Sequence, residues 1–174
     1  YPNIRMKKII ILAGYGLLPK LIVKKCKLRK ISFNILQFYD SEKILNNSHS
    51  KKVTFGNVLT NLKKLQKEGF DKILMAGSIQ RPNLKDLKPD LNSIKLLPKF
   101  VKKIMEGGDN NLLTLVINEL ENNGFKILSL RTFLPEIFIG KGNQTKCKIS
   151  KSNFLDIQKG IKILNNNSKF DIGQ

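Results

Sequence analysis

The fold is decided by the stretch "KKIIILAGYGLLPK", residues 7–20. Its apolar run, residues 7–13, is typical of a strand buried on both faces of a parallel sheet. Gly14 and Gly16 follow the strand and open a helix predicted over residues 17–28, whose first turn tolerates Pro19. A basic pair before an apolar run also begins secretory signals, but glycines interrupt this run and no cleavage site of the A-x-A type follows. The stretch therefore predicts a strand, a tight turn and a helix.

Strands and helices alternate along the rest of the chain, which predicts an α/β fold with a Rossmann-like, doubly wound, mainly parallel sheet. We expect this domain over residues 6–131, a linker over residues 132–150, and a helix with the beginning of a C-terminal domain over residues 151–174. The predicted strands are residues 31–38, 71–77 and 126–130; the predicted helices are residues 57–70, 94–105 and 152–164; and the polar stretch 39–52 is predicted as a loop.

The formal net charge of +19 suits an anionic partner such as a nucleic acid, a membrane surface or a phosphorylated substrate. Nucleic acid is not expected, because no binding motif is present, aromatic residues are only 7% and tryptophan is absent. Cys26 and Cys147 lie far apart in no metal-binding pattern, which fits free thiols in a reducing compartment. No apolar run reaches the roughly 18 residues of a membrane span. We therefore expect a cytoplasmic protein.

The turn at Gly14 and Gly16 has two interpretations. Backbone amides after a strand, at the start of a helix, can hold a phosphate, or the glycines simply permit a tight turn. Pro19 stands where a dinucleotide-binding fingerprint needs its third glycine, and Asp40 lies slightly beyond the strand where an acidic ribose contact is expected. A nicotinamide site is therefore not predicted. Tyr15 either stacks on a base or covers the turn.

The predicted strand over residues 71–77 is the second strand that leads into a glycine, and its end begins the stretch "AGSIQRP", residues 76–82. Ligands of open α/β sheets bind beyond the carboxyl ends of the strands, which is where we expect Gly77, Ser78 and Arg81. Arg81 can grip a phosphate through two parallel hydrogen bonds, or it is one more surface arginine of a basic chain.

Asp109 follows two glycines and directly precedes a predicted helix. It is either an N-cap of that helix or, with Asn110, a ligand for magnesium or a substrate hydroxyl. His49 lies in a polar stretch with no nucleophile motif around it, so no catalytic triad is predicted.

Four motifs together resemble one enzyme family. "IILAGYGLLP", "FGNVLTNLKKLQKEGFDKILMAGSIQRPNLKDLKPD", "IKLLPKFVKKIMEGGDNNLL" and the terminal "DIGQ" are similar to the UDP-2,3-diacylglucosamine pyrophosphatases of lipid A biosynthesis. The resemblance is to the two-domain type, which is distinct from the metallophosphoesterase that performs the same step. It runs over residues 6–174 and keeps the order and spacing of the motifs.

The resemblance implies magnesium-assisted hydrolysis of the pyrophosphate of UDP-2,3-diacylglucosamine to UMP and lipid X, in a cleft between two domains. It implies a lipid-linked UDP-sugar as substrate and a protein peripheral to the inner membrane, working at the inner-leaflet surface; a homodimer is left open. The substrate contacts that it implies are Gly14, Tyr15, Gly16, Gly77, Ser78, Arg81, Asp109, Asn110 and Gln174.

The chain departs from the family pattern in two ways. Asn110 stands where the family often has a second aspartate, which removes one candidate metal carboxylate. The family's catalytic acid belongs to the C-terminal domain, which is expected to begin near Gln174, so the catalytic residue is expected beyond this chain. We therefore expect no turnover by this chain alone. The alternative function is a non-catalytic module that binds a nucleotide or a UDP-sugar.

Overall fold

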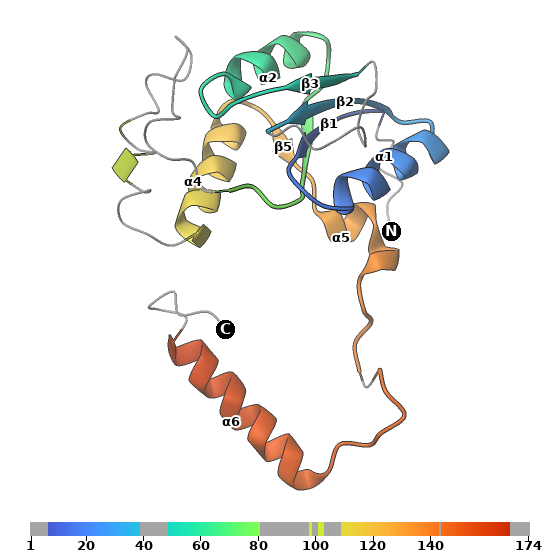
Figure 1. Cartoon of the computed structure of the whole chain (residues 1–174), viewed down its shortest axis with the longest axis vertical. Helices are drawn as coiled ribbons and strands as arrows, with labels where there is room; N and C mark the ends of the chain where they lie inside the picture. Colours follow the sequence, from blue (N-terminus) through green and yellow to red (C-terminus); the bar gives the residue numbers. More distant parts are fainter. Residues whose placement is uncertain are drawn as a thin grey trace. The chain divides into compact units, whose positions relative to one another are not determined.

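The computed structural model describes residues 7–38, 49–80, 98, 101–102, 109–142 and 144–167, and backbone only for residues 109–112. The chain forms two compact units, Tyr1–Ile137 and Phe138–Gln174. The first unit holds the sheet and its covering helices, and the second holds one long helix (Figure 1).

In the described part of the first unit, five parallel strands form one sheet in the order β3-β2-β1-β4-β5. The predicted α/β, Rossmann-like fold is confirmed. The chain connects β1 to β2 on one side and reaches β4 on the other, so the strand order reverses between β1 and β4, where open sheets bind ligands. The strands are β1 Lys8–Ala13, β2 Ser32–Gln37, β3 Ser50–Lys52, β4 Lys72–Ala76 and β5 Lys126–Ile127.

Helices cover both faces of the sheet (Figure 1). On one face, α1 and α5 pack on the strands through Ile22 and Phe133, and on the other face α2 and α4 contribute Leu62 and Leu120. The helices are α1 Leu18–Leu28, α2 Val58–Lys67, α4 Asp109–Asn122 and α5 Leu130–Phe133, followed by the 3-10 helix η3 Pro135–Ile137.

The central strand β1 is buried on both faces, which explains why its sequence shows no alternation of apolar and polar residues. Ile9 and Ile11 face α1, whereas Ile10 and Leu12 face α2, and all four side chains are almost fully buried. Each buried side chain of this size contributes about 1.5–3 kcal/mol to folding. A strand covered on both faces therefore reads as a continuous apolar run, as predicted for residues 7–13.

The structure corrects two predictions made from the sequence. Residues 39–52 were predicted as a loop, but Ser50–Lys52 forms β3, which pairs in parallel with β2. This strand is short, lies at the sheet edge and carries two exposed lysines, so it has no hydrophobic pattern to reveal it. The strand predicted over residues 126–130 is shorter, because α5 already begins at Leu130.

The helix predicted over residues 94–105 lies mostly outside the described residues. Positions 98, 101 and 102 are helical. The remaining predicted strands and helices are confirmed to within a few residues at their ends.

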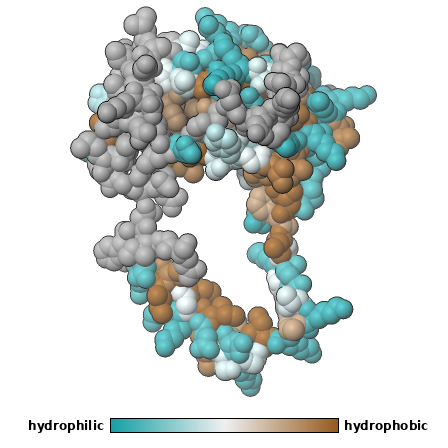
Figure 2. Space-filling model, in the orientation of Figure 1, coloured by the Kyte–Doolittle hydropathy of each residue, from teal (hydrophilic) through white to brown (hydrophobic). Residues whose placement is uncertain are grey.

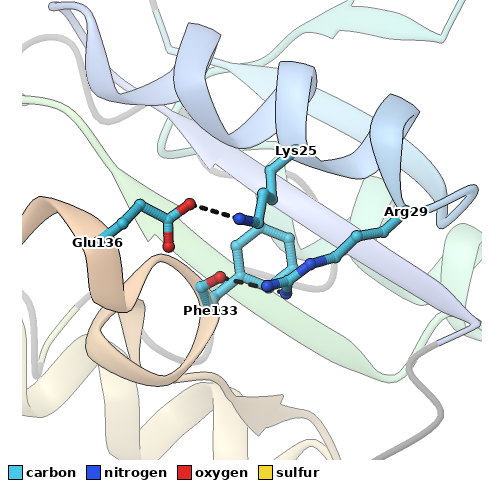
Figure 3. A network of polar contacts seen from close by, with 4 residues as sticks. All are labelled: Lys25, Arg29, Phe133 and Glu136. Carbon is cyan, nitrogen blue, oxygen red and sulfur yellow. Dashed lines mark hydrogen bonds and ion pairs between the residues drawn. The ribbon is translucent and has the colours of Figure 1, made fainter.

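A polar network ties the end of the first unit to α1 (Figure 3). Lys25 forms an ion pair with Glu136. Arg29 donates a hydrogen bond of 3.3 Å to the carbonyl oxygen of Phe133, and its guanidinium lies 5.6 Å from the centre of that ring. The Phe133 side chain itself is buried among the residues that α1 covers. The segment after β5 therefore belongs to the core of the first unit.

The second unit contains α6, Lys151–Asn167. Phe154, Ile157, Ile161 and Leu164 recur along α6 with heptad spacing and are 53%, 45%, 53% and 40% exposed. Figure 2 shows apolar side chains along this helix. Among the described residues, no helix is long and apolar enough to cross a membrane.

Candidate functional site

The loops that follow β1 and β4 are joined to each other at the carboxyl edge of the sheet. The amide of Gly14 donates to the carbonyl oxygen of Ala76 over 2.8 Å. Tyr15 and Ser78 exchange two backbone hydrogen bonds, of 2.8 Å and 3.0 Å. Both sequence motifs with glycine therefore meet in one place, at the point where the strand order reverses.

Two of the three glycines are required by this junction. A Cβ atom on Gly14 would lie 2.2 Å from the carbonyl oxygen of Ser78. A Cβ atom on Gly77 would lie 2.5 Å from the carbonyl oxygen of Tyr15, and Gly77 also has a φ of +90°. No side chain fits at either position. The interpretation of Gly14 as a tight-turn residue is therefore sufficient, and its amide is already bonded to β4.

Gly16 differs from the other two glycines. Its φ is +112°, and a Cβ atom there would meet no atom within 4 Å. Glycine at this position is explained by the backbone conformation alone, and the space beside it is open. An approaching ligand therefore finds room at Gly16 and not at Gly14.

The start of α1 lies directly after Gly16. Leu17 is the N-cap residue of α1 and makes no side-chain capping hydrogen bond, Pro19 occupies the first turn, and the first turn has no acidic residue. Amides at a helix N-terminus carry partial positive charge and bind phosphate groups. Because the amides of Gly14 and Tyr15 are bonded to the β4 loop, an anion at this edge would be held at Gly16 and the first residues of α1.

Exposed apolar side chains surround the junction. Tyr15 is 42% exposed, Leu17 is 71% exposed and Ile79 is 40% exposed. The Ser78 side chain is also exposed. The edge therefore combines a phosphate-compatible helix start with apolar side chains, which suits a ligand that has both an anionic and an apolar part.

Asp109 and Asn110 form the first turn of α4. This helix leads through Gly124 and Phe125 into the parallel strand β5, so it begins at the carboxyl edge of the sheet, as α1 does. Their side chains lie outside the description, so both the cap and the ligand interpretations of Asp109 stay open. Arg81, Gln174 and Asp40 lie outside the described residues.

A metal site is not formed by the described residues, among which no group of three histidine, cysteine or carboxylate side chains comes together. The carboxylates that Mg²⁺ prefers would have to come from other positions, of which Asp109 is the candidate named from the sequence. No catalytic step is therefore assigned to a metal here.

Two other candidate groups lie away from this edge. His49 precedes β3 and lines a groove of about 360 Å³ with Lys51, Asn61 and Lys64, between the sheet and α2. Its ring lies 6.1 Å from that of Phe33, centre to centre. It is therefore not part of the site formed by the two loops.

Cys26 is also excluded as a nucleophile. Cys26 belongs to α1 and its side chain is fully buried on the face that packs on the sheet, and burial raises the pKa of the thiol from its usual value to about 12. The thiolate, which is the reactive form, is therefore absent at neutral pH.

Gln37 is a candidate site residue that the sequence patterns did not indicate. It ends β2 directly opposite Ala13, the last residue of β1. Its side-chain nitrogen is buried and has no hydrogen-bond partner among the described residues. A polar residue ending a strand about 20 residues after the glycine turn is the signal that would have singled it out; Asp40 attracted attention instead because it is acidic.

Comparison with known proteins decides the family. Residues 8–137 match the family described as the LpxI N-terminal domain. The chain belongs to the LpxI family. A relative is the UDP-2,3-diacylglucosamine pyrophosphatase LpxI of Caulobacter vibrioides, which is 28% identical over 170 residues. The alignment covers 97% of this chain and 60% of the relative.

The match to the LpxI N-terminal domain spans the whole sheet. It ends at Ile137, which is also the last residue of the first compact unit. The resemblance expected from the sequence motifs is therefore confirmed. The alignment with the relative continues through most of the second unit, which contains α6.

Proposed function

We propose that this chain binds the UDP part of UDP-2,3-diacylglucosamine and contributes to hydrolysis of its pyrophosphate. Membership of the LpxI family supports a hydrolase function. The observation that carries the proposal is the junction of the β1 and β4 loops, which leaves Gly16 and the start of α1 open to an anion. A pyrophosphate is the anion that joins the two halves of this substrate.

In the proposed reaction, the oxygen of a water molecule forms a bond to the α-phosphorus. The bond from that phosphorus to the bridging oxygen breaks, the bridging oxygen leaves with the sugar phosphate, and a proton of the water is released. The products are UMP and lipid X. In this scheme the amides at Gly16 and the first turn of α1 hold the pyrophosphate, and Arg81 offsets its charge. When bound, Mg²⁺ would further neutralise the phosphate oxygens.

The apolar rim has a place in this proposal. Tyr15, Leu17 and Ile79 would contact the uracil ring or the first carbons of an acyl chain, because both present apolar surface to the protein. Asp109 and Asn110, at the start of α4, would contact a hydroxyl or the metal. Gln174 would add a further substrate contact.

We also propose that the chain cannot turn over alone, because no catalytic carboxylate is assigned within it. The test is release of UMP from UDP-2,3-diacylglucosamine in the presence of Mg²⁺. We expect no release by the chain alone. We expect release when the portion of the Caulobacter relative that the alignment leaves uncovered is added. Release by the chain alone would show that its own residues complete the site.

The non-catalytic binding module is the second candidate. It is favoured by the described site, which has glycines and a helix start but no cluster of carboxylates. Calorimetric titration combined with the UMP-release assay separates the two, since a module would bind UDP-sugars tightly and stay inactive with any added portion. Binding to duplex DNA of any sequence that falls steeply with salt would instead indicate a nucleic-acid-binding protein.

The location and assembly are parts of the same proposal. The net charge of +19 suits an anionic membrane surface, so we propose a cytoplasmic protein that is peripheral to the inner membrane. Co-sedimentation should be stronger with vesicles that contain anionic lipid than with neutral vesicles, and weaker at high salt. Sedimentation velocity tests homodimer formation.

A further inference from the structure

Gln37 lies at the carboxyl edge of the sheet with its backbone fixed on both sides. It is opposite Ala13 in the pairing of β2 with β1, and the amide of the next residue, Phe38, donates to Ala13 over 3.1 Å. On its other side, the amide of Val53 donates to the Gln37 carbonyl oxygen over 2.7 Å. The position of the side chain is therefore set by the central strands and not by a surface loop.

The side chain faces α1. Side chains alternate between the two faces along a strand, and Ile35, two residues earlier, packs with Ile22 of α1. The last row of side chains on this face reads Gln37, Ala13 and Ala76 across three neighbouring strands. Both alanines are buried in the core beneath α1. The row therefore offers the Gln37 amide no polar side chain from β1 or β4.

The side-chain nitrogen of Gln37 is unsatisfied among the described residues. It exposes less than 1 Å² to solvent and has no hydrogen-bond partner among them. Enclosing an amide donor without a partner costs folding free energy, and an apolar side chain of similar size would not incur that cost. No contact among the described residues accounts for this buried donor, which leaves it available to a bound ligand.

The expected position of a bound nucleotide supplies that partner. In sheets of this kind the phosphate lies at the turn after the first strand, and the ribose lies at the end of the neighbouring strand β2. Here the open part of that turn is Gly16 with the start of α1, which covers β2 on the Gln37 face. A ribose joined to a phosphate at Gly16 would therefore meet the end of β2.

We propose that Gln37 binds a ribose hydroxyl of the uridine nucleotide; this inference rests on the proposed function. The terminal amide torsion of glutamine is soft, so the amide can turn from its enclosed position toward the crevice. An amide both donates and accepts hydrogen bonds, which matches the two neighbouring hydroxyls of a ribose. Gln37 acts as a positioning and specificity residue, because it touches the nucleotide away from the reacting phosphorus.

Calorimetric titration of the full chain with UMP and with 2′,3′-dideoxy-UMP tests the inference. Removing one hydrogen bond is expected to weaken binding roughly fivefold to tenfold. Gln37→Leu and Gln37→Met should therefore bind UMP that much more weakly than the unchanged chain does. All three proteins should bind the dideoxy nucleotide equally, because the hydroxyls that Gln37 contacts are then absent.

Asn34→Leu is the matched control, since it removes another amide from β2, on the opposite face of the sheet. It should leave the affinity for both nucleotides unchanged. Thermal unfolding of each variant shows that it is folded, and Gln37→Leu should melt no lower than the unchanged chain. UMP binding that is equal in the unchanged chain and in both Gln37 variants would overturn the inference, as would an equal loss for both nucleotides. No UMP binding by the unchanged chain would overturn the proposed function itself.

Discussion

The carbonyl oxygen of Ser78 lies 2.2 Å from the point where Gly14 would carry a Cβ atom. The close neighbour is backbone, which cannot turn aside as the end of a flexible side chain can. Gly14→Ala should therefore force the two loops apart and destabilise the chain by about 1–3 kcal/mol, the usual cost of overpacking. Urea unfolding followed by circular dichroism measures the change.

The matched control for this substitution is Gly140→Ala. A Cβ atom at Gly140 would meet no atom within 4 Å, and its φ is not positive. The control should change the free energy of unfolding by less than about 0.5 kcal/mol. If Gly14→Ala were as harmless as the control, the junction of the two loops would not be as tight as described.

The sequence predicted the fold because the central strands are buried on both faces and therefore read as unbroken apolar runs. It could not reveal β3, whose exposed lysines give no apolar pattern at the sheet edge. The meeting of Gly14 with Ser78 followed from the rule that parallel strands end at one edge. The sequence could not show that Gly14 contacts the loop after β4 closely and bonds its amide to Ala76, because these distances are not contained in any sequence pattern. Gln37 was missed for the same reason, since its missing partner is visible only in three dimensions.

The end of the first unit can be tested by truncation. Phe133 and Leu134 are 1% and 3% exposed and pack in the core beneath α1. A chain ending after Ile137 keeps both side chains, whereas one ending after Arg131 loses them. Removing a large buried side chain costs about 2–5 kcal/mol, which is a large part of the stability of a domain.

We therefore expect residues 1–137 to unfold cooperatively in urea and residues 1–131 to be unfolded or close to it. Phe133→Ala in the longer fragment separates the effect of the core from that of chain length, and it should cost about 3–5 kcal/mol. Equal stability of the two fragments would mean that the domain ends before Phe133.

The two cysteines should differ in reactivity. Burial raises the pKa of the Cys26 thiol to about 12, and its side chain is inaccessible, whereas Cys147 is exposed. An aromatic disulfide reagent at pH 8 should therefore modify one thiol in the folded chain and two in urea. Cys147→Ser should leave the folded chain without a reactive thiol. Rapid modification of Cys26 in that variant would show that α1 opens readily from the sheet.

The ion pair between Lys25 and Glu136 should make stability depend on pH. The hydrogen bond from Lys25 lowers the pKa of the Glu136 carboxyl below its usual value. A carboxyl with a lower pKa when folded stabilises the protein above its unfolded pKa, near 4.5. This contribution is lost as the pH falls through the lower, folded value. Glu136→Gln should therefore melt at a lower temperature than the unchanged chain at pH 7.

The difference in melting temperature should shrink on acidification from about pH 5 to pH 3, the range in which an exposed carboxyl of lowered pKa takes up its proton. The difference in melting temperature should be small at every pH, because exposed ion pairs contribute little to stability. It should be smaller still in about 0.5 M salt, which screens the two charges. Glu121→Gln, an exposed carboxylate on α4, is the control and should not change the pH dependence in this way. A difference that stays constant from pH 7 to pH 3 would mean that Glu136 acts through packing and not through its charge.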